Sequence, residues 1–231
     1  MDDAEVFATF TSEAARVDLN AAPKEMLAGL FEVLGTEQKA ASELADRIIG
    51  WRSPPKPNAA DDEGSLYLAS GLTYSPRQAP LAHVNELSLV LGASPAIVER
   101  ALPYLTVFSK SADIDALIAP PEVVAALPGM TPEVLNDFLK QRPSLPRDQK
   151  AVAAALGPAA NAAETLPEAK AFRVLTTLRF DNGRRMSSEA VISLDSSAKG
   201  KDTDKEKKPY SVLSWQDQAE ITARPLKQAV R

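Results

Sequence analysis

The sequence predicts an α+β fold, in which both ends of the chain build an antiparallel β-sheet and a large helical domain is inserted between them. Alternating apolar residues at 6–10 indicate a strand near the N-terminus. Apolar residues at helical spacing then dominate residues 20–156. Alternation returns at 172–180 and is followed by Asn182-Gly183, a pair that favours a hairpin turn. A chain of 231 residues has room for one large domain or two small ones.

The first strand would place Val6, Ala8 and Phe10 on one face, although Phe7 makes the alternation imperfect. After residue 20 the pattern becomes helical. Pro23 suits the start of a helix, and the following glycine at 35 suits its C-terminal end.

A second helix is predicted from Thr36, a good capping residue, to Trp51. The proline-rich segment 53–58 must end it, because proline fits neither the interior of a helix nor that of a sheet. From there to about Pro80 we expect a long irregular loop. Such a loop inside a domain is usually functional or tied down by other contacts.

Helices resume after this loop in two sets. Proline and glycine mark their ends, and a short apolar segment between the sets reads as a strand. The predicted elements are helices at 84–91 and 95–102, a strand at 104–108, and helices at 120–127, 132–139 and 148–156.

The C-terminal third is predicted to be β-structure. Strands are expected at 172–180, 185–194 and 210–215, with a hairpin between the first two. The segment 195–209 is rich in Ser, Lys and Asp and offers little to bury, so we expect a mobile loop there.

Composition argues against several classes of protein. The net charge is −5, which weighs against binding through phosphates, and there is no cysteine for a disulfide or a thiolate site. His83 is the only histidine and is expected to be structural. No nucleotide-binding, serine-hydrolase or zinc-protease motif is present, so we predict that the protein is not an enzyme. No apolar stretch is long enough to span a membrane.

Two segments of the helical domain are related. Residues 17–30 align without gaps with residues 114–127, and identical Asp, Ala, Pro, Glu, Ala and Leu residues recur. Each copy with its following helix resembles a helix-hairpin-helix unit. The domain is therefore predicted to hold two related halves, at about 17–103 and 114–156.

Helix-hairpin-helix units often bind DNA, which is the alternative function. That activity needs a glycine-rich hairpin whose backbone N–H groups meet a phosphate, usually helped by Lys or Arg. The hairpins at 34–37 and 128–131 each contain a single glycine, and the first also contains Glu37. The sequence therefore favours a packing role for these helix pairs.

An ordered set of segments resembles the K-type minor pseudopilins of bacterial type II secretion systems. The match covers roughly residues 16–142. The segments that carry it are 17–23, 48–52, 74–81, 84–92, 101–107 and 119–129.

The resemblance implies a pilin-like sheet formed by residues 1–16 and 170–231, with an inserted α-helical domain at 17–169. It also implies a structural role at the tip of a periplasmic pseudopilus, where the protein binds minor pseudopilins of the I and J types and supports protein export. The chain would be the periplasmic domain of a single-pass inner-membrane protein, without its N-terminal membrane helix.

Some relatives bind calcium in the loop after the second helix, which makes Asp61, Asp62 and Glu63 candidate ligands here. Calcium takes six to eight oxygen ligands, and three clustered acids could supply part of that set. The relatives often have Asp where this chain has Gly50 and Ser53. A solvated acidic turn is therefore the favoured interpretation, with calcium as the alternative.

Overall fold

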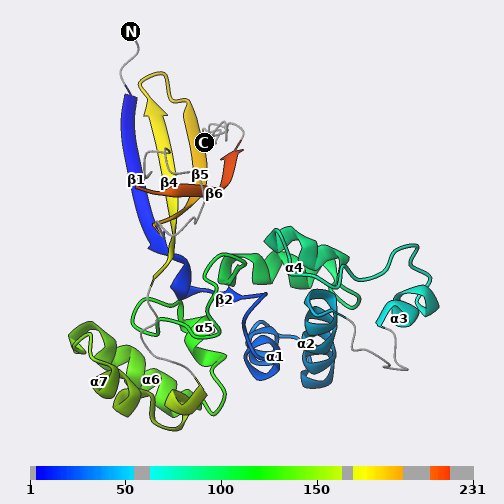
Figure 1. Cartoon of the computed structure of the whole chain (residues 1–231). Coiled ribbons are helices and arrows are strands. Elements are labelled where there is room, and N and C mark those ends of the chain that lie inside the picture. Colours follow the sequence, from blue (N-terminus) through cyan, green and yellow to red (C-terminus); the bar gives the residue numbers. More distant parts are fainter. Residues whose placement is uncertain (1–3, 55–62, 163–168, 195–208, 219–231) are drawn as a thin grey trace, which may run out of the picture. The chain divides into compact units, whose positions relative to one another are not determined.

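The computed structural model describes residues 4–54, 63–162, 169–194 and 209–218 (Figure 1). The chain divides into two compact units. One is made by Met1–Ser12 with Lys170–Arg231, and the other by Glu13–Ala169. The first unit is the sheet and the second is helical, so the predicted α+β class is confirmed.

The sheet unit contains four described strands in the order β1-β4-β5-β6, and each neighbouring pair is antiparallel. A tight hairpin joins β4 to β5. Gly183 adopts a φ of 83° in this turn, and the side chain of Asn182 accepts a hydrogen bond of 3.0 Å from the backbone N–H of Arg184. The strands are β1 (Ala4–Ser12), β4 (Ala171–Phe180), β5 (Arg185–Ser193) and β6 (Ser211–Gln218). The predicted loop at 195–209 lies almost wholly outside the described residues.

The helical unit is built from α-helices and short 3₁₀ helices, with one small parallel strand pair. The α-helices are α1 (Lys24–Val33), α2 (Gln38–Arg52), α3 (Glu63–Ala69), α4 (Pro95–Ala101), α5 (Pro121–Ala125), α6 (Pro132–Gln141) and α7 (Gln149–Leu156). The 3₁₀ helices are η1 (Glu13–Ala15), η2 (Val84–Leu89), η3 (Leu102–Tyr104), η4 (Arg142–Ser144) and η5 (Gly157–Ala162). Strands β2 (Val17–Asp18) and β3 (Leu105–Thr106) pair in parallel.

The segment predicted as an irregular loop contains α3, so that prediction was wrong there. Tyr67 is fully buried on this helix, 6.0 Å from the rings of both Trp51 and Tyr74. Its hydroxyl also accepts a hydrogen bond of 3.1 Å from the backbone N–H of Leu91. These distant contacts stabilise the helix, and local sequence does not reveal them.

The segment Glu13–Ala15, which the sequence places with the sheet, belongs to the helical unit. The carboxylate of Glu13 is buried and accepts a hydrogen bond from the hydroxyl of Thr106. The carbonyl of Ala14 accepts a hydrogen bond of 2.8 Å from Asp115 N–H. These residues therefore join the start of the helical unit to segments about a hundred positions later.

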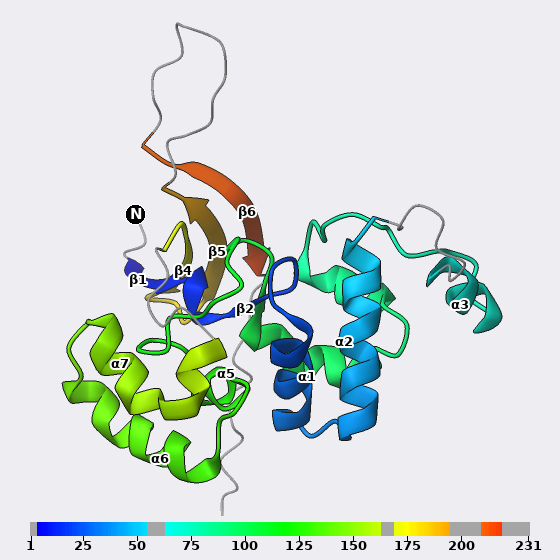
Figure 2. The same ribbon diagram turned by 60° about the horizontal axis from the view of Figure 1, so that its bottom comes forward.

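The hydrophobic core lies in the helical unit. Its buried residues run from Val17 to Ala159 and include Leu27, Phe31 and Phe138, each fully enclosed. Helices α1 and α2 lie side by side at its centre (Figure 2). This unit therefore has its own core.

Candidate interaction surfaces

One face of the sheet carries two rows of apolar residues, several of them well exposed. Antiparallel partners lie on the same face, so the strand register gives the residues that form each row across the sheet. We define the apolar face by two such rows, Val6–Leu178–Met186 and Phe10–Val174–Ala190–Trp215.

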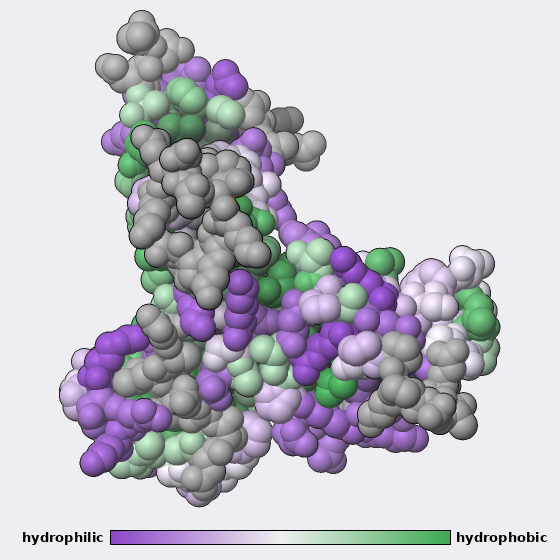
Figure 3. Space-filling model, viewed as in Figure 1, coloured by the Kyte–Doolittle hydropathy of each residue, from purple (hydrophilic) through white to green (hydrophobic). Residues whose placement is uncertain are grey.

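Side chains at the two edges of the apolar face are well exposed. Val6 and Phe10 on β1 leave 62% and 67% of their surface accessible, and Trp215 on β6 leaves 63%. Hydrophobic residues along the strands are visible as green atoms in Figure 3. The row between the two, Ala8–Thr176–Ser188–Asp217, is mostly polar. Exposed apolar side chains gathered on one face are typical of a contact site for another protein or segment.

The opposite face of the same strands is more polar. Arg173 and Glu189 form an ion pair there, and Thr9, Thr11 and Thr177 share that face. Phe7 is its exposed aromatic residue on β1. The two faces therefore differ in chemistry, although both belong to the same strands.

The related segments of the helical unit make the same turn. Asp18 Oδ1 accepts a hydrogen bond of 2.7 Å from Asn20 N–H, and Asp115 Oδ1 accepts one of 3.1 Å from Leu117 N–H. An arginine from the end of the second helix then reaches each turn. Arg52 donates to the carbonyls of Leu19 (2.6 Å) and Ala22 (2.8 Å), while Arg142 donates to that of Ala119 (2.7 Å).

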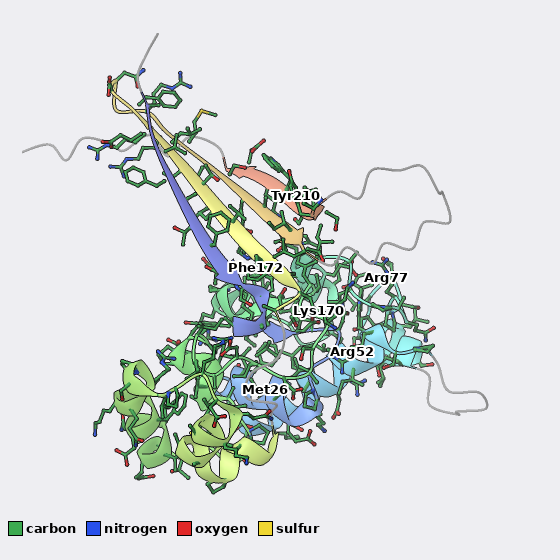
Figure 4. All side chains as sticks on the ribbon, turned by 60° about the vertical axis from the view of Figure 1, so that its left-hand side comes forward. Met26, Arg52, Arg77, Lys170, Phe172 and Tyr210 are labelled. Carbon is green, nitrogen blue, oxygen red and sulfur yellow. The ribbon has the colours of Figure 1, made fainter. Side chains whose placement is uncertain are left out.

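Arg52 lies at the end of α2 (Figure 4). The carboxylate of Asp18, on β2, is almost completely buried, and burial raises its pKa above the ordinary value of 3.8. Hydrogen bonds from Asn20, Lys110 and Ser109 oppose that effect. Asp18 is therefore a structural carboxylate that fastens β2 to the segment after β3.

The hairpins between the paired helices give DNA binding no support. Gly35 and Gly129 have φ angles of 87° and 82°, as helix ends commonly require. Arg100 Nη1 donates to the carbonyl of Leu34 at 2.7 Å, and the carboxylate of Glu37 accepts from Ala40 N–H. These groups bind the backbone of the hairpin itself. The identification of the pairs as helix-hairpin-helix units stays a prediction.

Of the three predicted calcium ligands, Asp61 and Asp62 lie outside the described residues. Glu63 begins α3, and its Oε2 forms an ion pair of 2.9 Å with Arg47 Nη1. A Cβ at position 50 would lie 2.6 Å from the Glu63 carboxyl carbon, so Gly50 leaves the space that this side chain occupies. Within the described part of the chain, no three acidic or histidine side chains gather as a metal site. Calcium binding remains a prediction.

His83 acts as a helix cap. Its Nδ1 accepts a hydrogen bond of 3.1 Å from Asn85 N–H at the start of η2. In the ranges described, no helix is both long and apolar enough to cross a membrane.

Sequence reasoning did not identify Met186 and Trp215 as surface residues. Their positions on the apolar face depend on how β4, β5 and β6 pair, and on an irregularity at Val191 and Ile192 that shifts the register. The sequence signal that could have found them is the alternation of apolar residues in the strands after residue 170. Alternation shows that a strand has an apolar face, but it does not show which residues of the neighbouring strands lie beside it.

Comparisons with known proteins agree on one family. A protein-family model for type II secretion system protein K matches residues 10–110. Type II secretion system protein K of Klebsiella pneumoniae is 28% identical over 153 residues, which cover 59% of this chain and 46% of that protein. The chain therefore matches less than half the length of this relative.

The fold is also shared with a solved structure, the GspK-GspI-GspJ complex of the type 2 secretion system of enterotoxigenic Escherichia coli. The TM-score is 0.69 at 16% identity, covering 94% of this chain and 81% of that chain. At this identity the likeness concerns the fold alone. The family model and the Klebsiella relative match as well, so in both sequence and fold the chain is similar to type II secretion system protein K.

Proposed function

We propose that this chain is a structural subunit at the tip of a type II secretion pseudopilus, where it binds minor pseudopilins of the I and J types. The match to the protein K family model supports the role, and the similar fold comes from a GspK-GspI-GspJ complex. The task is assembly that supports protein export across the outer membrane, and it needs no catalytic step.

The proposal places the chain in the periplasm, as the outer domain of a single-pass inner-membrane protein. The family supports this location. An apolar N-terminal helix would anchor the protein and lead into β1.

The apolar face of the sheet is the observation that carries the proposal. Val6, Phe10 and Trp215 each expose more than half of their surface to water, which is unfavourable for side chains of this kind. Covering them with an apolar surface of a neighbouring pseudopilin removes that area from water. Hydrophobic contact would therefore hold the sheet in the assembly.

Binding to a purified I–J pair tests this proposal, with calorimetry as the readout. Phe10→Ser removes an exposed aromatic from the apolar face, and Phe7→Ser removes one from the opposite face of the same strand. We expect Phe10→Ser to weaken binding about tenfold or more, as loss of an aromatic interface anchor commonly does. Phe7→Ser should change affinity less than about threefold.

Equal losses from the two variants would contradict the use of the apolar face. No measurable binding of the wild-type chain to the I–J pair would contradict the proposed role itself. Thermal unfolding of each variant should match wild type, because both side chains are exposed in the isolated chain.

A further inference from the structure

A groove crosses the helical unit. It has a volume of about 710 Å³ and lies between α1, the first half of α2 and the turn that follows α5. Figure 2 shows α1 between α2 and α5. All of its lining residues belong to the helical unit, so the groove does not depend on how the two units are placed.

The floor of the groove consists of small and apolar residues. Ala28 and Gly29 come from α1, and Ala126 and Leu127 come from the turn that follows α5. A Cβ at Gly29 would lie 2.6 Å from the carbonyl oxygen of Ala126, so glycine permits this close approach of the two segments. Val33 adds an apolar side chain that is 41% exposed.

Acidic side chains outnumber basic ones around this floor. The carboxylates are those of Glu25, Glu32, Glu37 and Glu43, and the ammonium groups are those of Lys24 and Lys39.

Most of these charges already have partners. Lys24 lies 2.8 Å from Asp46, and Lys39 lies 3.9 Å from Glu43. Glu25 and Glu32 are exposed, and their carboxylates form no hydrogen bond or ion pair with other residues that the structure describes. They are two turns apart on α1, about 10 Å along its axis.

We propose that this groove binds a basic amphipathic helix of a partner protein. Its apolar side chains would lie on the floor, and its Lys or Arg residues would lie against Glu25 and Glu32. A helix with basic residues seven positions apart repeats the spacing of these two acids. Helix-in-groove recognition combines apolar anchors on one face with charges at the border, as this groove requires. Phosphate-rich partners are disfavoured, because the border is acidic.

This interaction is separate from the proposed contacts of the sheet. The test uses the whole chain and a fluorescently labelled synthetic helix with leucine on one face and lysine on the other, followed by anisotropy. A peptide with glutamate in place of lysine serves as the charge control. We expect saturable binding of the lysine peptide, at least about tenfold tighter than that of the glutamate peptide.

Three variants locate the binding site. Glu32→Lys replaces a negative charge by a positive one at the border of the groove. Glu99→Lys makes the same charge change on α4, outside the groove. Ser42→Trp places a large side chain in the groove without changing charge. Glu32→Lys and Ser42→Trp should each weaken binding about fivefold or more, while Glu99→Lys should change it less than about twofold.

Non-specific charge attraction would appear as equal losses from Glu32→Lys and Glu99→Lys, and it would overturn the proposal. Absence of saturable lysine-peptide binding would overturn it as well. If Ser42→Trp fails to fold, the matched pair of charge variants still decides the matter. Phe10→Ser should leave peptide binding unchanged, so this result and the result for the sheet are independent.

Discussion

The helical unit and the sheet unit bury their apolar residues to very different extents. Nearly all of the fully enclosed hydrophobic side chains belong to residues 14–159, whereas the described strands of the sheet contribute only Ala171 and Val191. The strands nevertheless contain many apolar residues, and those of the apolar face remain partly or largely exposed. The difference indicates that the helical unit is stabilised by its own core, and it supports the proposal that a partner covers the apolar face of the sheet.

The largest expected effect compares two phenylalanines. Phe31→Ala removes a fully buried ring from α1 and should lower the free energy of unfolding by about 3–5 kcal/mol. Phe10→Ala removes a ring that is 67% exposed on β1 and should cost about 0.5 kcal/mol or less. Urea unfolding of the isolated chain measures both. Similar losses of unfolding free energy in the two variants would mean that the sheet also has a core of its own.

A smaller effect tests the two related turns within the helical unit. Arg52→Ala leaves the carbonyls of Leu19 and Ala22 without their charged donor, and should cost about 2–3 kcal/mol. Arg142→Ala affects a single such bond, to Ala119, and should cost about half as much. Thermal unfolding of both variants shows which of them loses more stability. A reversed order would show that the second turn stabilises the unit more than the first.

The smallest effect concerns pH. Because burial raises the pKa of Asp18, its contribution to stability is greatest below 3.8 and is lost as the pH rises through the raised value. Asp18→Asn cannot ionise, so we expect the stability of the variant relative to wild type to improve as the pH rises through that window. Urea unfolding at a series of pH values measures the difference. A relative loss for the variant with rising pH would contradict the direction of this shift.

The sequence allowed the prediction of elements whose signals are local. The helix starting near Pro23 and the strand pair around Asn182-Gly183 needed only capping residues, periodicity and turn chemistry. Helix α3 was missed because the burial of Tyr67 depends on Trp51 and Leu91, which lie far away in the sequence.

The candidate surfaces were harder to predict for the same reason. Glu63 reads as a possible metal ligand in sequence, but its pairing with Arg47 depends on the packing of α3 against α2. The acidic groove forms where α1, the first half of α2 and the turn after α5 meet. Only α1 and α2 are adjacent in the chain. Hydrophobic alternation indicates that a strand has an apolar face, but it does not tell whether the protein itself covers that face.

The two tryptophans offer the most direct test of the central claim that a partner covers the sheet. Trp51 is 4% exposed in the helical unit, whereas Trp215 is 63% exposed on the apolar face. The chain would be labelled with 5-fluorotryptophan, and the effect of replacing H₂O by D₂O on each ¹⁹F resonance would be measured with and without the I–J pair. We predict that Trp215 loses its solvent effect in the complex while Trp51 is unchanged. A complex in which Trp215 keeps its full solvent effect would contradict the claim.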